Sequence, residues 1–220
     1  MSINFLSGLF AGDIDIAYRR LLEYASSLSS PPDLLAEAQI AKWYAVKTYR
    51  LKTKGTISEE EKRQIKEYEV IAKSKLAYIN NNYTDDRNYY QGSKTTILPI
   101  LLRLKGIAVG SLTAAGDTSL GDPEKIFLEA LQLPQPLWVS SVTRFTYAVF
   151  LAAAYGEKRK EDIANLLSDF YTPSSGVELD WRTWLSNELA NPTADQQSIR
   201  LLASIDPKFK ALLANSGWKF

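Results

Sequence analysis

The sequence contains no histidine and no cysteine, and its single methionine is Met1. Histidine is the commonest general base and a frequent metal ligand, and cysteine is the commonest soft nucleophile. Their absence excludes Ser-His-Asp and Cys-His catalysis, zinc fingers and histidine-based metal or haem sites. Carboxylate, lysine, tyrosine or hydroxyl chemistry is still available, but the chain carries no motif for it. We therefore expect no catalytic residues, no cofactor and no metal site, and hence a protein that is not an enzyme.

An excess of charge of either sign is also missing. The chain has 26 Lys and Arg against 25 Asp and Glu, which gives a formal net charge of +1. No overall field draws such a protein to nucleic acid or to an anionic membrane, so any such contact must come from a local patch. The lack of cysteine excludes a disulfide framework and fits a reducing compartment, from which we expect a cytoplasmic location.

Long uninterrupted apolar runs are absent as well. The longest candidate, residues 97–115, is broken by Arg103 and Lys105, whereas a spanning helix needs ~20 apolar residues. Residues 1–12 are fairly apolar but have no basic flank in front, which a signal peptide requires. We interpret them as an arm or short helix that packs on the body of the protein, and we expect no membrane contact.

The strongest pattern in the sequence is the helical periodicity of its apolar residues. Apolar residues recur at three- and four-residue steps through most of the chain, and convincing strand alternation is absent apart from a short extended piece near 175–178. These patterns predict an all-α fold, an irregular multi-helix bundle. The expected helices are 14–28, 33–53, 58–80, 97–115, 123–133, 141–155, 160–171, 180–190, 193–204 and 207–214.

Residues 33–80 predict a long antiparallel helical hairpin on which the bundle is built. The first helix runs to about Thr53, and Gly55 is a natural residue for its C-terminal cap. Ser58 and Glu61 have the spacing of a capping box that starts the second helix. Two long helices joined by so short a turn are expected to lie antiparallel.

The segment that follows the hairpin suggests a boundary. Residues 80–86 are polar and aperiodic, and the linker continues to Ser93. We predict N-terminal helices with the hairpin over 1–84 and a C-terminal helical subdomain over 94–220. One continuous domain is the alternative.

Two helices of the second half carry local signals. Pro99 is expected in the first turn of the helix 97–115, and Gly106 and Gly110 share a face that allows a neighbour to approach closely. The run Asp122-Pro123-Glu124 is a typical helix start, with an N-cap, a proline and an acid in order.

Cations and planar side chains gather on the hairpin and at its exit. Trp43, Tyr44 and Tyr49 are interleaved with basic residues, and this combination is what single-stranded nucleic-acid binding needs. The alternative is that the lysines solvate a helix face while the aromatics pack inside. The candidate nucleic-acid-binding residues are Lys47, Arg50, Lys52, Lys54, Arg87, Tyr89, Tyr90 and Lys94.

Other features have a structural alternative at least as simple as a functional one. The loop 115–122 could hold a cation or a phosphate, but it matches no calcium loop and no P-loop, so a capped turn is the alternative. Two acid pairs fit paired-carboxylate chemistry or ordinary capping. Three tryptophans fit anchoring of the tail or a partner-docking face. These residues are Asp13 with Asp15, Asp85 with Asp86, and Trp181, Trp184 and Trp218.

Residues 98–107, Leu-Pro-Ile-Leu-Leu-Arg-Leu-Lys-Gly-Ile, carry a local resemblance. They resemble the Pro…Arg-x-x-Gly-Leu helix of the small α-helical subunits in type III CRISPR effector complexes. The resemblance covers ten residues, and Lys105 stands where that family usually has an asparagine before the glycine. It implies a subunit of an RNA-containing complex, and we assign no family from it.

These observations leave three classes of function. The first is a non-enzymatic helical binding or scaffold protein, a subunit of a larger assembly with a protein partner or self-association. The second is a single-stranded nucleic-acid (RNA) binding subunit of a ribonucleoprotein complex that uses the basic and aromatic surface. The third is an enzyme with carboxylate or lysine chemistry at a site that the sequence does not locate. Convergence of the candidate cations on one concave surface would favour the second class.

Overall fold

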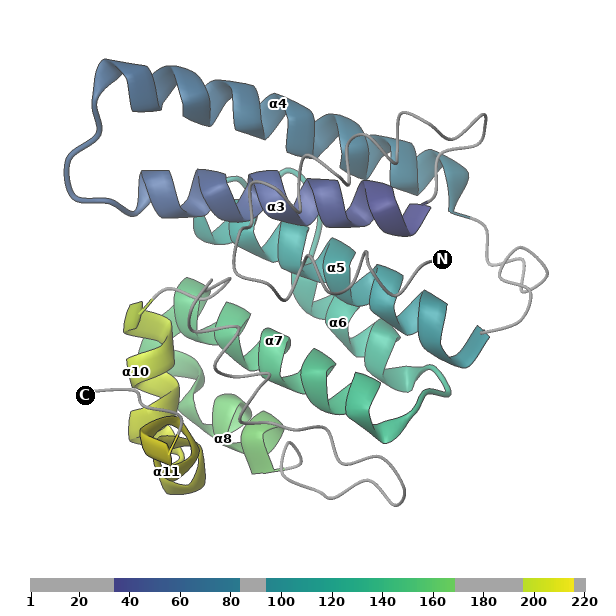
Figure 1. The fold of residues 1–220 in the computed structure, drawn as a ribbon, viewed down its shortest axis with the longest axis vertical. Helices are drawn as coiled ribbons and strands as arrows, with labels where there is room; N and C mark the ends of the chain where they lie inside the picture. Colours follow the sequence, from purple (N-terminus) through teal and green to yellow (C-terminus); the bar gives the residue numbers. More distant parts are fainter. Residues whose placement is uncertain (1–33, 84–93, 169–195, 216–220) are drawn as a thin grey trace.

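The computed structural model describes residues 34–83, 94–168 and 196–215 (Figure 1). Within these ranges the chain is helical and contains no strand, which confirms the all-α fold class. Several predictions fall outside the described residues and stay predictions. They are the helices 14–28 and 180–190, the extended piece near 175–178, both acid pairs, the three tryptophans, and the candidate residues Arg87, Tyr89 and Tyr90.

The predicted hairpin is present. Helix α3 (Leu34–Lys52) and helix α4 (Glu59–Asn82) lie side by side and run in opposite directions (Figure 1). The capping box is confirmed, because Ser58 Oγ accepts from the Glu61 N–H at 3.2 Å and Glu61 Oε2 accepts from the Ser58 N–H at 2.8 Å.

The end of α3 differs from the prediction. The helix ends at Lys52, and Gly55 is not among the described glycines with positive φ. Instead, the backbone N–H and the hydroxyl of Thr53 both donate to the Tyr49 carbonyl, at 2.9 Å each. The last turn of α3 is therefore closed by Thr53 and not by a left-handed glycine at position 55.

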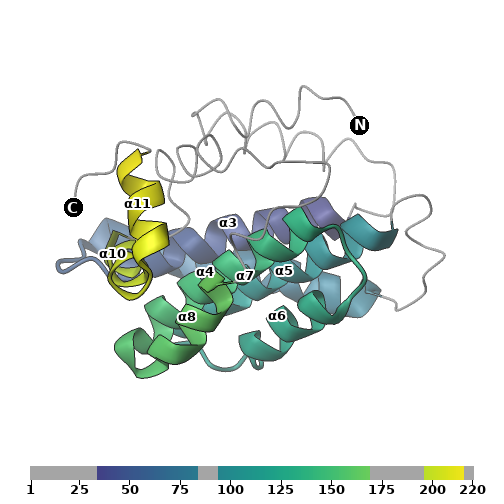
Figure 2. The ribbon, with the colours of Figure 1, turned by 90° about the horizontal axis from the view of Figure 1, so that it is seen from below.

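The remaining helices stack below the hairpin. Helix α5 packs against α3, helices α6 and α7 pack against α5, and the shorter elements close the far side of α7 (Figures 1 and 2). Their bounds are α5 Lys94–Ala114, α6 Pro123–Gln132, α7 Leu137–Tyr155, the 3-10 turn η1 Gly156–Arg159, α8 Lys160–Ser168, α10 Gln196–Ile205 and α11 Pro207–Asn215.

Two helices begin earlier than the sequence predicts. Helix α5 starts at Lys94, so Pro99 lies inside the helix and not in its first turn. Helix α7 starts at Leu137 directly after Pro136, which provides no side-chain cap. The predicted starts of α6 and α11 are confirmed, since Asp122 accepts from the Glu124 N–H at 2.9 Å and Asp206 accepts from the Lys208 N–H at 2.7 Å.

Helix α5 lies between two apolar clusters. Leu101 and Leu112 belong to a core shared by α3, α4, α5 and α6, in which Leu76 and Ile79 represent α4. Ile107 packs instead against a second core formed by α6, α7, α8, α10 and α11. Helices from both sides of the proposed boundary between 84 and 94 thus share the first core, and the division into two subdomains stays a prediction.

The two glycines of α5 receive aromatic rings. A methyl group added at Gly106 would lie 3.0 Å from the ring of Phe127 on α6, and one added at Gly110 would lie 2.7 Å from the ring of Phe150 on α7. The contact at Gly110 is closer than a real Cβ tolerates and the one at Gly106 is tighter than most, so the missing side chains let α6 and α7 pack closely on α5. The close approach predicted for this face is therefore present, within the molecule.

Candidate functional site

The candidate cations at the end of the hairpin are held by carboxylates of α4. Lys52 forms an ion pair with Glu69, and its Nζ also lies 3.4 Å from the Ala115 carbonyl oxygen. Lys54 Nζ lies 2.5 Å from Glu61 Oε1. The ion pair and the hydrogen bonds that Glu61 accepts from Ser58 lower the pKa of Glu61 to about 2. Lys52 therefore joins the end of α3 to α4, and Lys54 joins the connection between the two helices to the start of α4.

Lys47 lies among aromatic rings on the hairpin. Its Nζ is 4.9 Å from the centroid of the Trp43 ring and 5.6 Å from that of Tyr68. The Tyr44 and Tyr68 rings pack with their centroids 5.3 Å apart. This is the arrangement of a cation–π contact between α3 and α4, and it places a cation beside planar side chains as the sequence pattern suggested.

The structure does not bring Lys94 together with Lys52 and Lys54. Lys94 begins α5, whereas Lys52 contacts Ala115 just beyond the end of the same helix. At 1.5 Å per residue these ends are ~30 Å apart. Arg50 lies half-buried on α3, and convergence with Arg87, Tyr89 and Tyr90 stays a prediction.

In the loop between α5 and α6, the Asp117 carboxylate is bound by groups of the protein itself. Asp117 accepts from the N–H of Ser119 at 3.0 Å and from its hydroxyl at 2.6 Å, and it forms an ion pair with Lys73 of α4 at 2.5 Å. Lys73 is the main cause that lowers the pKa of Asp117 to about 2. Over the described ranges, no three acidic side chains gather as a metal site would require. The loop is built as a capped turn tied to the hairpin.

A cluster that the sequence did not reveal joins α6, α7, η1 and α8. Arg159 donates to both carboxylate oxygens of Glu124, at 2.8 and 2.9 Å, and the Tyr147 hydroxyl donates to Glu124 at 2.6 Å. Arg159 also pairs with Asp162. The Arg159 guanidinium lowers the pKa of Glu124, while burial and the neighbouring Glu124 raise the pKa of Tyr147. We name these four residues the Glu124 clamp.

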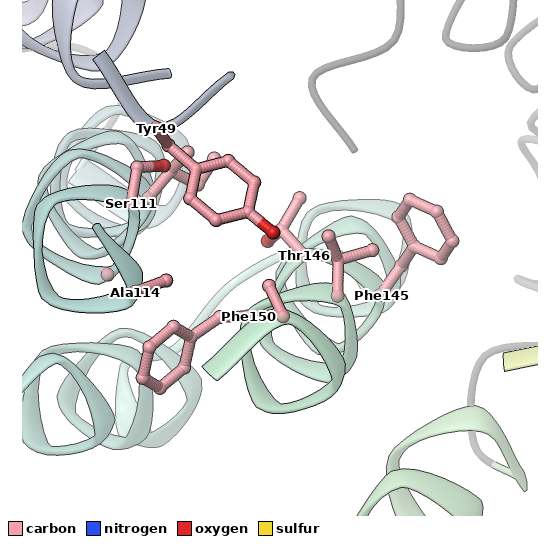
Figure 3. Close-up of a pocket in the computed structure, with 10 residues that line it drawn as sticks. Tyr49, Ser111, Ala114, Phe145, Thr146 and Phe150 are labelled. Atoms are coloured by element: carbon pink, nitrogen blue, oxygen red, sulfur yellow. The ribbon is translucent and has the colours of Figure 1, made fainter. Parts of the chain in front are cut away.

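A pocket lies between α3, α5 and α7 in the part of the chain that the structure describes (Figure 3), and we call it the α3/α5/α7 pocket. The free space in and above this depression is about 480 Å³, part of which is open solvent. Its lining is Tyr49, Ile107, Gly110, Ser111, Ala114, Phe145, Thr146, Val149, Phe150 and Ala153.

Hydroxyls supply the polar side-chain groups of this lining. Thr146 Oγ1 already donates within α7, with the Val142 and Thr143 carbonyls at 3.0 Å each. Tyr49 comes from α3, with its hydroxyl directed toward Thr146 (Figure 3). The lining includes no carboxylate, lysine or arginine. Such a surface accepts an apolar group and provides no acid–base pair at neutral pH.

The pocket had only a partial signal in the sequence. The Gly106–Gly110 face predicted a close neighbour but not which helix supplied it. Tyr49 was noted only as an aromatic among basic residues. The α7 residues of the lining gave no signal, because a single sequence does not indicate which other helices will lie opposite a given face of α7.

The fold and the pocket define a class, an all-α bundle with an uncharged depression between three helices. Comparison with family models, with curated proteins and with solved structures gives no match to this chain. None of the helices in the described ranges combines the length and the apolar character needed to cross a bilayer.

Proposed function

We propose that this chain is a non-enzymatic helical binding protein, a subunit of a larger assembly, and that the α3/α5/α7 pocket receives an apolar side chain from a helix. The observation that carries the proposal is the lining of the pocket, which combines apolar side chains with hydroxyls and has no charged group. Apolar anchors that fill such depressions supply most of the energy in helix-in-groove recognition. The proposed location is the cytoplasm, on the strength of the cysteine-free sequence.

Four acidic residues that face cations of other elements support a binding role. Glu69, Asp117 and Glu124 each face a cation from another element. Glu37 is 4% exposed and lies 2.8 Å from Lys75 of α4. Carboxylates held in this way fix helices against one another, and a general acid or base would need access to a reacting group.

The proposal is tested by placing a charge in the pocket. Val149→Asp puts a carboxylate in the lining, and Val70→Asp is a matched control on α4, where Val70 is 67% exposed. Partners would be recovered by affinity purification from native cells and quantified, with self-association measured by sedimentation. We expect Val149→Asp alone to lose the specific partner or the self-association. Equal recovery by both variants, with folding intact by circular dichroism, would contradict the proposal.

Single-stranded nucleic-acid binding in a ribonucleoprotein complex is the second candidate. The contact of Lys47 with the Trp43 and Tyr68 rings favours it, since a cation beside planar groups suits stacked bases and phosphates. The ion pairs of Lys52 and Lys54 weigh against it, because they reduce the positive potential available to phosphates.

A titration with short fluorescent single-stranded RNA and DNA at low and moderate salt tests this candidate. If the surface binds phosphates, Lys52→Glu combined with Lys54→Glu weakens binding to all sequences alike and lowers the salt dependence. Tyr89→Ala or Tyr90→Ala should lose ~1–3 kcal/mol of binding if a base stacks on that ring. Lys66→Glu with Lys125→Glu, two exposed lysines elsewhere, is the charge-matched control. No binding by the wild type at low salt would eliminate this candidate.

A further inference from the structure

Lys105 of α5 differs from the lysines that tie the hairpin to its neighbours. Lys73 Nζ lies 2.5 Å from a carboxylate oxygen of Asp117, and Lys75 Nζ lies 2.8 Å from one of Glu37. Lys105, by contrast, forms no ion pair with any residue that the structure describes. Its amine is therefore placed among the helices without the counter-ion that the others have.

The surroundings of Lys105 are apolar along its own helix. The side chain is half-buried at the edge of the core shared by α3, α4, α5 and α6. Residues three and four apart share a helix face, and the residues at these spacings from Lys105 are all buried in that core. They are Leu101, Leu102, Ala108 and Val109. The ammonium form of Lys105 therefore loses hydration and gains no carboxylate in return.

A ring and a more distant carboxylate complete the surroundings of this amine. Lys105 Nζ lies 5.9 Å from the centroid of the Tyr83 ring, at the C-terminal cap of α4. The Tyr83 hydroxyl donates to Glu129 Oε1 of α6 at 3.4 Å. Burial lowers the pKa of Lys105, and the Glu129 carboxylate opposes this only in part, so the pKa is lowered overall.

This placement has a chemical consequence. Only the neutral form of an amine carries the lone pair that attacks an electrophile, and desolvation raises the neutral fraction at neutral pH. Lys66 and Lys125 are exposed, so water stabilises their ammonium forms. Lysine chemistry is also one of the routes that a chain without histidine and cysteine still has. Lys105 is therefore the described lysine whose surroundings favour a nucleophile.

We propose that Lys105, half-buried between α5, the cap of α4 and α6 and without a counter-ion among the described residues, is a covalent modification site for small neutral aldehydes. The amine lone pair attacks the carbonyl carbon, a proton passes from nitrogen to oxygen, and water leaves as the C=N bond of the imine forms. The step is reversible and needs no oxidant or reductant. The negative charge of Glu129 disfavours an anionic aldehyde. Lys105 does not line the α3/α5/α7 pocket, so the inference does not rest on the proposed function.

Reductive labelling of the full chain tests the proposal. The folded protein is treated at neutral pH with a limiting amount of propionaldehyde and with cyanoborohydride, which traps the imine, and peptide mass spectrometry gives the labelled fraction of each lysine. We expect Lys105 to be labelled several-fold faster than the exposed Lys66 and Lys125. In Lys105→Arg this label should be lost while the other lysines keep theirs. Labelling of Lys105 at or below the rate of the two exposed lysines would overturn the proposal.

A second variant tests the surroundings of the amine. Glu129 is exposed, so Glu129→Gln should fold, and it keeps an oxygen that accepts from Tyr83 while it removes the charge that favours the ammonium form. We expect faster labelling of Lys105 in this variant and no change at Lys66. Glu67→Gln, at an exposed position of α4, is the matched control and should leave the rate at Lys105 unchanged. Slower labelling in Glu129→Gln, or equal rates in both variants, would overturn the proposal.

Discussion

At the scale of single residues, two glycines fix how α5 meets its neighbours. Their shared face was predicted from the four-residue spacing, because a missing side chain is a local property that the sequence states directly. The rings that fill the space, Phe127 and Phe150, were not predicted, because they come from other helices and any exposed or buried phenylalanine has the same sequence signature.

Gly110→Ala is expected to destabilise the protein. A methyl group there would lie 2.7 Å from the Phe150 ring, which is only 5% exposed. Such overpacking costs ~1–3 kcal/mol, against ~1 kcal/mol gained in helix propensity. Chemical denaturation of the variant should show a net loss of stability. Gly55→Ala is the control, since nothing lies within 4 Å of that position. A Gly110→Ala protein as stable as the wild type would contradict the close contact.

Polar contacts were likewise predictable from the sequence when they are local and not when they join distant residues. Caps such as Ser58 with Glu61 and Asp122 with Glu124 were predicted correctly, because donor and acceptor lie within three residues of each other. The Glu124–Arg159 pair joins residues 35 apart and was missed. Charge alone gives each cation many possible partners, and the fold decides which of them it meets.

At the scale of elements, the hairpin depends on a well-formed start of α4. Three glutamates, Glu59, Glu60 and Glu61, occupy the first turn, where they also favour the positive end of the helix dipole. The two helices meet the turn differently, with a capping box on α4 and a threonine hydroxyl on α3.

Ser58→Ala should cost ~1 kcal/mol of the free energy of unfolding, because it leaves the Glu61 N–H without its side-chain acceptor. Ser74→Ala is the matched control on the same helix, where the exposed hydroxyl only bonds back to the Ile71 carbonyl. It should be neutral or slightly stabilising. Urea denaturation of both variants measures the difference, and equal stabilities would show that the box contributes nothing.

Helix starts were predicted where a side chain marks them and missed where none does. Helices α6 and α11 follow Asp122 and Asp206, and both were placed correctly. Helix α7 follows Pro136, whose ring provides no acceptor for the first N–H groups. The first turn of α7 therefore had no start signal in the sequence. Its apolar residues next to Pro134 and Pro136 are equally compatible with a loop.

At the scale of the whole molecule, the missing histidine determines the response to pH. No side chain of the sequence has an ordinary pKa between about 5 and 8. Asp117 and Glu61 have folded pKa values of about 2, and the pKa of Glu124 is also lowered. Carboxylates whose pKa is lower in the folded state stabilise the protein above their unfolded pKa and lose that contribution as they become protonated.

The free energy of unfolding should therefore change little between about pH 5 and 8 and fall as pH drops from about 4.5 toward 2. Asp117→Asn should remove part of this acid dependence, because an amide does not titrate and the ion pair with Lys73 is gone. Denaturation at a series of pH values gives the slope directly. A steep change in stability between pH 6 and 7 would contradict the expectation.

The two rings seated on α5 also limit how the molecule can move. Sliding α5 along its axis by one turn, about 5.4 Å, would bring other side chains of the same helix face against Phe127 or Phe150. The packing of these rings on the two glycines therefore opposes translation of α5 relative to α6 and α7. Helix α4 packs mainly on α3 and hardly touches α5. Since α3 packs on α5 as extensively as on α4, any large displacement on binding should involve α4 rather than the block of α3, α5, α6 and α7.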